Sequence, residues 1–302
     1  MSLELRPVDR SDPEDRRRYL AGLDAAFNGW GDDARFRWAF DRACGAGSAD
    51  LVVLVDESGL WVAGSAVTHR LIGTPAGDRV HAGIMTGSWT LAEARGRGCF
   101  TDLIQWSLDV VHRSSVGVLL AFVTDTNASR RRLEASGAAT VPTWYMVWPT
   151  PSPTGAPSAI AVDIGSAAGL PKAAIAERAG VHHVAYPDAE AWLAQLIDRP
   201  DPVDVVEVPG GWAVIERAPT TDRALAVISD GSGEALDPVA VLGSLTGRAA
   251  DHARQLFAFT TDPAWAEAAR ATRADIQPGR LTVLGDTTVA EGPWRVGGGD
   301  RM

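Results

Sequence analysis

The sequence is poor in cysteine and contains no long apolar run. Its 302 residues include two cysteines, Cys44 and Cys99, which fit a reducing compartment and cannot form a metal site between them. No stretch of about 18 consecutive apolar residues, the length that spans a membrane, occurs in the chain. The N-terminus is charged from Glu4 onward and lacks the apolar centre of a signal peptide. We therefore expect a cytoplasmic protein with no metal and no membrane partner.

The sequence also lacks an excess of basic residues. Its net charge of −10 and pI near 5.1 argue against nucleic acid or an anionic membrane as a partner, because both are polyanions. The same charge favours a cationic acceptor such as a polyamine or an amino sugar. A hydrophobic content of 46% and a charged content of 22% are ordinary for a soluble globular protein. The length exceeds the usual single-domain size, so we expect two domains.

Residues 80–138 carry the most informative motif. Ile84–Leu91 has the pattern of a strand, and apolar residues recur at helical spacing from Phe100 to Val111. Between them lies the glycine-rich run RGRGCF at positions 95–100. Glycines let the backbone approach a ligand closely, and a helix N-terminus presents unpaired N–H groups at the positive end of its dipole. This arrangement predicts a site for an anion such as a pyrophosphate.

Two common phosphate-binding patterns do not fit this run. The nucleoside-triphosphate loop requires a lysine after its second glycine, and none follows Gly98. The dinucleotide fingerprint requires a third glycine where the sequence has Thr101. The run instead resembles the coenzyme A loop Arg-x-x-Gly-x-Gly/Ala of the GCN5-related N-acetyltransferases, in the order strand, loop, helix. Phe100 departs from the small residue that usually ends this loop.

A second element of that family follows the first. Val116–Thr124 reads as a buried strand, and Asp125–Ser129 begins a helix that ends at Gly137. This resembles the family's strand, its Asn-x-x-Ser/Ala helix and its terminal Gly-Phe, with Ala138 in place of the aromatic residue. The family often carries a tyrosine four residues before that glycine, which can protonate the leaving thiolate. Here the position is Leu133.

The resemblance implies a fold, a co-substrate and a reaction. The fold is of the α/β (α+β) class, with a central, mostly antiparallel mixed sheet flanked by helices, and the co-substrate is acetyl-CoA or another acyl-CoA. The amine attacks directly in a ternary complex, and a backbone N–H near Leu91 holds the thioester carbonyl where the two strands separate. The residues that the resemblance assigns to the coenzyme are Leu91, Arg95, Gly96, Arg97, Gly98, Cys99, Phe100, Thr101, Asn127 and Ser129.

The catalytic proton acceptor and donor have three candidates. Asp125, at the end of a strand, is the first candidate for the general base, and capping the next helix is its alternative role. His81 is the second, because its pKa lies in a suitable range, although a lone histidine near a strand start is often a surface residue. Tyr145 could supply the acid that Leu133 cannot, or it could pack in the core. The pair His182-His183 lacks the further ligands that a metal site needs.

The N-terminal half has the order expected for the acetyltransferase fold. The patterns predict helices over 14–28 and 33–42, strands over 51–55 and 60–67, and a hairpin over 70–91. Aromatic residues are frequent here, and eleven tryptophans occur in the whole chain. Several precede or line the presumed acceptor side, where flat rings could stack on a substrate, but core packing is the default role for each.

A linker and a repeat organise the chain. Residues 149–158 are almost wholly proline, glycine, serine, threonine and alanine, which predicts a linker between domains at 1–148 and 159–302. We expect the strand at 138–148 to close the first domain. The second domain repeats short segments of the first in the same order, including LLAFVTD at 119–125 as LFAFTTD at 256–262.

The second copy has lost the coenzyme motif. Its corresponding loop, residues 229–234, has the sequence SDGSGE, with two acidic residues and no arginine. Carboxylates would repel a pyrophosphate, so we expect one coenzyme per chain. This pattern resembles tandem acetyltransferases in which one half is active and the other is degenerate.

These observations give one leading function and two alternatives. The leading function is N-acylation of a small amine, such as an amino sugar, an antibiotic-like amine or an amino-acid derivative. One alternative is a non-catalytic acyl-CoA-binding module, which Leu133 and the missing strand carboxylate would fit. The other is a transferase that takes its acyl group from a carrier protein or aminoacyl-tRNA. Its candidate basic patch is Arg130-Arg131-Arg132, which is more simply the solvated face of a helix. A homodimer is left open.

Overall fold

The fold comes from a computed structural model that describes residues 3–43, 46–113, 117–149, 158–162, 169–176, 180–232 and 235–301. Cys44, most of the predicted linker and the last two residues of the predicted acidic loop lie outside the described residues. None of the described helices is both long and apolar enough to cross a membrane.

The N-terminal half follows the predicted order of helices and strands, with an unpredicted strand before the first helix and with the strand predicted at 60–67 continuing into the first arm of the predicted hairpin. Its strands are β1 (Leu3–Pro7), β2 (Asp50–Asp56), β3 (Trp61–Gly73), β4 (Arg79–Thr90), β5 (Val118–Thr124) and β6 (Ala139–Trp148). Its helices are α1 (Pro13–Phe27), α2 (Asp33–Phe36) with a π-helical continuation over Arg37–Asp41, a short 3₁₀ turn (Ala92–Ala94), α3 (Cys99–His112) and α4 (Ala128–Ala135). The glycine-rich run therefore joins β4 to α3, as predicted.

The C-terminal half repeats this order of elements. Its strands are β7 (Ile160–Val162), β8 (His182–Ala185), β9 (Val203–Val208), β10 (Gly211–Arg217), β11 (Thr221–Ser229), β12 (Gln255–Thr260), β13 (Asp275–Gly285) and β14 (Trp294–Arg295). Its helices are α5 (Leu170–Ala176), α6 (Ala189–Leu196), α7 (Pro238–Asp251), α8 (Pro263–Ala271) and two 3₁₀ turns (Thr287–Ala290 and Gly298–Arg301). The run from β9 to β13 matches the run from β2 to β6 element by element, which accounts for the repeated segments in the sequence.

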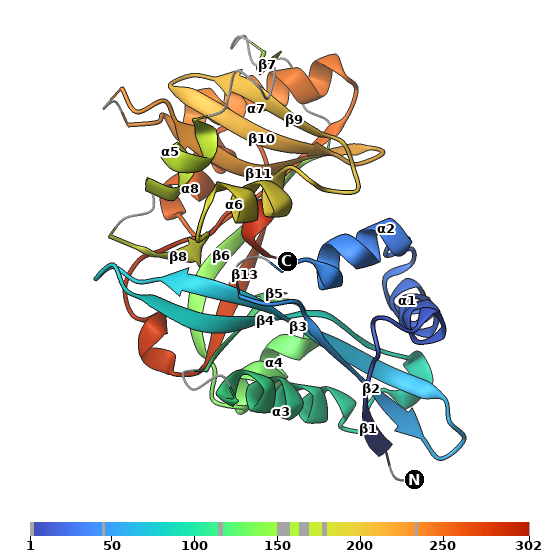
Figure 1. Cartoon of the computed structure of the whole chain (residues 1–302). Helices are drawn as coiled ribbons and strands as arrows, with labels where there is room; N and C mark the ends of the chain where they lie inside the picture. Colours follow the sequence, from blue (N-terminus) through green and yellow to red (C-terminus); the bar gives the residue numbers. More distant parts are fainter. Residues whose placement is uncertain are drawn as a thin grey trace.

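Helices cover both faces of the sheet in the N-terminal half. Val52 and Leu54 of β2 pack in one apolar cluster with α3, whereas Leu51 and Val53 pack in another with α1 and α2. Side chains alternate across a strand, so a strand covered on both faces must be apolar throughout. Figure 1 shows α3 and α4 on the opposite side of the sheet from α1 and α2. Many aromatic residues of the first half pack in this second cluster, which contains Phe36, Trp38, Phe40, Trp61 and Trp89.

The two halves form one continuous sheet and exchange their last strands. The strand order is β1-β2-β3-β4-β5-β13-β6-β12-β11-β10-β9-β7. β13, from the second half, pairs with β5, while β6, from the first half, pairs with β12 and β13. The prediction that residues 138–148 close the first domain was therefore wrong. Both strands follow equivalent helices, so local pattern does not say which of them lies beside β5.

Candidate functional site

A large cavity lies between the two halves, next to the glycine-rich loop. Its volume is about 1040 Å³. One part of its wall comes from β4, the loop, β5 and α4, and another part comes from residues of the C-terminal half near β10, β11, β12 and the final 3₁₀ turn. The exchange of strands thus brings residues of the second half against the predicted coenzyme site.

The glycine-rich loop has the backbone conformation that its glycines allow. Gly96 and Gly98 have φ angles of +83° and +85°, in the left-handed region that other residues rarely adopt. A Cβ atom at either position would meet nothing within 4 Å, so the loop backbone faces open space. Gly98 is the N-cap of α3 and provides no side-chain hydrogen bond to it. The Thr101 N–H donates to the Gly98 carbonyl oxygen at 2.8 Å, and no side chain caps the first-turn N–H groups of Cys99 and Phe100, which could bind an anion.

Most of the predicted coenzyme residues line this cavity. The ones that do are Arg95, Gly96, Gly98, Cys99, Phe100, Thr101, Asn127 and Ser129. Arg97 is not among the lining residues, although the loop that carries it is. Burial raises the pKa of the Cys99 thiol, whose Sγ lies 3.6 Å from the Ala94 carbonyl oxygen. These contacts fit a packing role for Cys99 better than the role of a reactive thiolate.

The parallel strands β4 and β5 separate beside the loop. They pair only at Ala82–Ile84 and Val118–Leu120, and beyond these pairs both strands line the cavity. β4 also carries a bulge here: Ala66 and Gly64 of β3 face Thr86 and Trp89, so two residues of β4 stand opposite Ser65. A gap between parallel strands leaves backbone groups without ladder partners.

The structure corrects the predicted donor at Leu91. The Leu91 N–H donates to the carbonyl oxygen of Val62, 2.9 Å away, and Leu91 does not line the cavity. Leu91 follows the end of β4 and is still held against β3. The bulge at Gly87 and Ser88, which do line the cavity, is the part of β4 where the backbone leaves the ladder.

Asp125 does not cap α4 and lies outside the cavity lining. Asn127, not Asp125, caps α4, because its side chain accepts a hydrogen bond from the Ser129 N–H at 3.0 Å. The Asp125 carboxylate forms ion pairs with Arg130 at 3.2 Å and Arg280 at 3.4 Å. It is not among the residues that line the cavity. Asp125 instead ties the end of β5 to α4 and to the exchanged strand β13.

His81 and Tyr145 also lie outside the lining of the cavity. His81 is opposite Leu71, near the start of β4, and its ring stacks on that of His69 at 5.1 Å. Burial and the neighbouring His69 lower the His81 pKa. Tyr145 packs edge-on against Phe259 at 5.0 Å, and burial raises its pKa. The core role considered for Tyr145 is therefore the one that its contacts support.

Sequence reasoning missed the charged residues that the second half supplies. Arg199, Glu216, Arg223 and Arg301 line the same cavity as the loop. They belong to a loop, two strands and a terminal turn that are far apart along the chain, and no motif connects them. The only available signal was that the second half repeats the fold of the first, which does not indicate which residues reach the cavity.

The sequence matches no protein-family model and no curated protein sequence. Solved structures do match over nearly the whole chain. A tandem GNAT protein from the clavulanic acid biosynthesis pathway has a TM-score of 0.63 at 14% identity, with 93% of this chain and 98% of that chain covered. The chain has the fold of the GCN5-related N-acetyltransferases.

Two further structures support this fold. A GCN5-related N-acetyltransferase from Sphaerobacter thermophilus has a TM-score of 0.61 at 16% identity, with 93% of this chain and 95% of that chain covered. N-myristoyltransferase from Saccharomyces cerevisiae, solved with bound myristoyl-CoA, has a TM-score of 0.64 at 11% identity, with 93% of this chain and 82% of that chain covered. The predicted α/β class and duplicated arrangement are thereby confirmed.

The second copy of the GNAT fold differs at the place that matches the coenzyme loop. α7 corresponds to α3, and its N-cap is Asp237, whose carboxylate accepts a hydrogen bond from the Val239 N–H at 3.0 Å. The Asp230 carboxylate accepts another from the Ser232 N–H at 2.8 Å in the preceding turn. A carboxylate caps the N-terminus of α7, whereas no side chain caps the N-terminus of α3.

Within the described part of the chain, no group of three or more histidine, cysteine, aspartate or glutamate side chains is arranged to hold a metal ion.

Proposed function

We propose that the protein is an acyl-CoA-dependent N-acyltransferase, with acetyl-CoA as the donor and a small amine as the acceptor. The observation that carries this proposal is the N-terminus of α3, capped only by Gly98, which opens on a cavity at the point where β4 and β5 separate. The fold shared with GCN5-related N-acetyltransferases supports it.

Each part of the coenzyme has matching groups in the cavity wall. The pyrophosphate accepts hydrogen bonds from the first turn of α3, and the charges of Arg95 and Arg132 lie along the same wall. Asn127 and Ser129 supply polar groups beside the pantetheine arm. The acyl group enters the gap between β4 and β5, where the bulge at Gly87 and Ser88 offers backbone N–H groups to the thioester carbonyl.

The reaction exchanges one bond for another. The neutral amine attacks the thioester carbonyl carbon, a C–N bond forms and the C–S bond breaks. The nitrogen loses one proton and the sulfur gains one, so the products are an amide and free coenzyme A. Asp125, His81 and Tyr145 do not line the cavity, and Leu133 does. We therefore assign the proton transfers to water and to hydroxyl groups of the wall, such as Ser88, which lies 2.8 Å from Ser65 Oγ.

The lack of a candidate base or acid among the lining residues favours one alternative, a non-catalytic acyl-CoA-binding module. Release of free thiol from acetyl-CoA in the presence of a panel of amines separates the two functions. An N-acyltransferase releases thiol in an amine-dependent manner and forms the amide, and calorimetry finds one coenzyme per chain. Tight coenzyme binding without amine-dependent thiol release across the panel would favour the binding module.

A further inference from the structure

The cavity has a second end, formed by charged residues of the C-terminal half. Arg199 follows α6, Glu216 lies on β10, Arg223 lies on β11, and Arg301 lies in the final 3₁₀ turn. All four line the cavity together with the coenzyme loop. Because the loop and the strand gap account for the coenzyme, the acceptor has to use the remaining part of the cavity.

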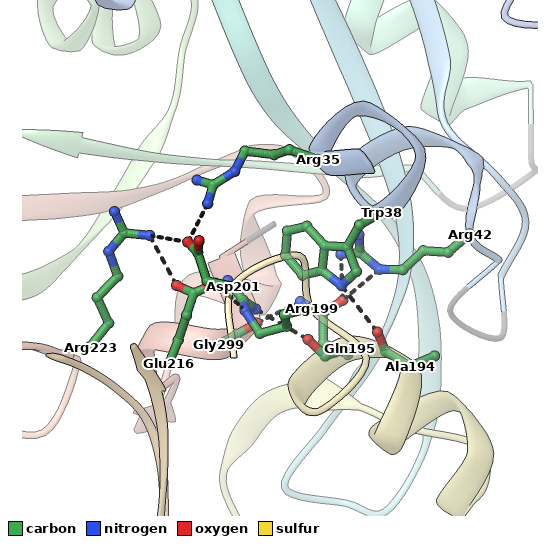
Figure 2. Close-up of polar contacts among 10 residues, drawn as sticks. All are labelled: Arg35, Trp38, Arg42, Ala194, Gln195, Arg199, Asp201, Glu216, Arg223 and Gly299. Carbon is green, nitrogen blue, oxygen red and sulfur yellow. Dashed lines mark hydrogen bonds and ion pairs between the residues drawn. The ribbon is translucent and has the colours of Figure 1, made fainter. Parts of the chain in front are cut away.

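Glu216 holds two of these arginines in place. One of its carboxylate oxygens accepts from Arg199 Nε at 2.7 Å and the other accepts from Arg223 Nη1 at 2.9 Å (Figure 2). Arg199 and Glu216 are buried, with side-chain exposures of 7% and 2%. The two arginines lower the Glu216 pKa against the effect of burial, which would raise it. Glu216 is therefore ionised and fully engaged, which makes it a positioning residue rather than a general base.

The side chain of Arg199 is held by contacts within the protein. Its guanidinium lies over the ring of Trp38 at 4.1 Å, and its Nη1 donates to the carbonyl oxygen of Gln195 at 3.1 Å. Its Nε donates to the Glu216 carboxylate, so the guanidinium is engaged by a ring, a carbonyl oxygen and a carboxylate. Arg199 thus fixes the carboxylate, and the carboxylate in turn orients Arg223.

Arg223 and Arg301 both line the cavity. The contacts of Arg223 with Glu216 and Asp201 all go through Nη1, and Asp201 is shared with Arg35. Arg301 lies among the rings of three aromatic residues, with its guanidinium carbon 4.5–5.3 Å from the ring centres of Tyr145, Phe257 and Phe259. Its Nε is buried and has no hydrogen-bond partner among the described residues. Because Nε is inaccessible to solvent, an anion in the cavity would meet the two Nη groups of this guanidinium instead.

The local charge is opposite to that of the whole chain. Three arginines and one glutamate line this end of the cavity, and the neighbouring pair of Arg35 and Asp201 leaves that balance unchanged. An ammonium ion would be repelled here, whereas a carboxylate or phosphate would be attracted and could be held by charge-assisted hydrogen bonds. The net charge of −10 suggested a cationic acceptor, but it describes the surface as a whole.

We infer that the acceptor is an amine that also carries an anionic group, and that Arg223 and Arg301 bind this group. The inference rests on the proposed function for the position of the coenzyme. The inference also explains how the amine could lose its proton although neither Asp125 nor His81 lines the cavity. Nearby cations disfavour the protonated form of a bound amine and lower its pKa, so the acceptor loses its proton more readily at this end of the cavity.

The test compares amines that differ only in the anionic group. Phenylalanine is paired with phenethylamine, tyrosine with tyramine, and phosphoethanolamine with ethanolamine. For each pair, thiol release from acetyl-CoA and calorimetric binding to the coenzyme A complex are measured with the full-length protein. We expect at least one anionic member to exceed its partner by about 10- to 100-fold in kcat/KM or in affinity. No preference for the anionic member in any pair, in turnover or in binding, would overturn the inference.

Two variants and a control assign the effect to the arginines. Arg223→Gln keeps the buried pair of Arg199 and Glu216, and Arg223 is 37% exposed, so the fold should tolerate the change. We expect the KM for the anionic acceptor to rise about 10-fold or more, with the KM for acetyl-CoA unchanged. Arg301→Gln should act in the same direction. Arg217→Gln, on β10 outside this cavity, removes an ion pair with Asp204 and should leave both KM values unchanged.

The outcomes separate this inference from the proposed function. Binding of an anionic amine that depends on Arg223, without thiol release, would leave the anion site standing and refute the transferase activity. Thiol release with amines regardless of their anionic group would support the activity and refute the anion site. Equal effects of Arg223→Gln and Arg217→Gln on the acceptor would also refute it.

Discussion

One residue distinguishes the two equivalent helix N-termini. At the start of α3 the N-cap is Gly98, which leaves the first-turn N–H groups without a side-chain partner. At the start of α7 the N-cap is Asp237, whose carboxylate accepts from the Val239 N–H. A helix N-terminus attracts one anion, so an aspartate at the cap competes with a pyrophosphate. The same fold can thereby carry a coenzyme site in one half and a closed helix end in the other.

The coenzyme loop gives a prediction at the scale of one residue. Gly98→Asp places a carboxylate at the proposed pyrophosphate site. We expect the affinity for acetyl-CoA to fall by about 100-fold or more, because several charge-assisted hydrogen bonds are lost. Isothermal titration calorimetry measures this loss. Gly231→Asp is the matched control, because Gly231 has a similar φ of +77° and open space around it but lies in the second copy. An unchanged affinity in Gly98→Asp would remove the loop from the coenzyme site.

At the scale of elements, the exchanged strand β13 determines how the halves join. It pairs antiparallel with β5 on one side and with β6 on the other. Thr282, fully buried on β13, donates through Oγ1 to the carbonyl oxygen of Ala121 at 3.0 Å. Gly279 lets the strand pass closely between its neighbours, since a Cβ there would lie 2.5 Å from the Val123 carbonyl oxygen and 2.6 Å from the Tyr145 ring.

The fit of β13 predicts the effect of one added methyl group. Gly279→Ala forces the strand away from β5 or displaces Tyr145, and overpacking of this kind costs about 1–3 kcal/mol. We expect the free energy of unfolding in urea to fall by that amount. Gly169→Ala is the control, because a Cβ at Gly169 meets nothing within 4 Å and its φ is ordinary. Equal stability of the two variants would show that β13 does not pass this closely.

At the scale of the whole molecule, the halves of the sequence are not the halves of the sheet. Residues 1–148 contain β6, which stands beside β12, and lack β13, which stands beside β5. The cavity wall also needs both halves. The linker at 149–158 predicted a separate first domain. Residues 1–148 alone would leave β5 with an unpaired edge and β6 without its neighbours.

The exchange predicts that the halves do not fold separately. We expect residues 1–148 expressed alone to be aggregated or unfolded and not to bind acetyl-CoA, because the removal of β13 exposes the apolar edge strand β5. Co-expression with residues 159–302 should restore a soluble complex that binds one coenzyme. The intact chain should unfold in a single transition, as cooperative units do. A folded first half with normal affinity, shown by a dispersed NMR spectrum and by calorimetry, would contradict this prediction.

The sequence determined the features that depend on a few consecutive residues. The left-handed glycines at 96 and 98 and the start of the helix after them were predictable, because backbone conformation and helix ends are local properties. The repeated segments likewise indicated the duplicated order of elements. The sequence did not determine which way the side chain of each candidate catalytic residue points. A strand end at Asp125 does not reveal that its carboxylate turns toward Arg130 and Arg280.

Tertiary structure alone decided what lies across the cavity and which strand stands where. β6 and β13 are equivalent in pattern, and only the docking of the two halves puts β13 beside β5. Arg199, Glu216 and Arg301 carry no motif, and they gain a role only because the sheet brings them to one end of the cavity. The pairing of strands that are distant in sequence depends on the packing of the whole chain, whereas the conformation of a glycine-rich turn depends on residues next to it in sequence. For this reason the sequence could predict the loop of the proposed coenzyme site, but it could not predict the charged residues across the cavity.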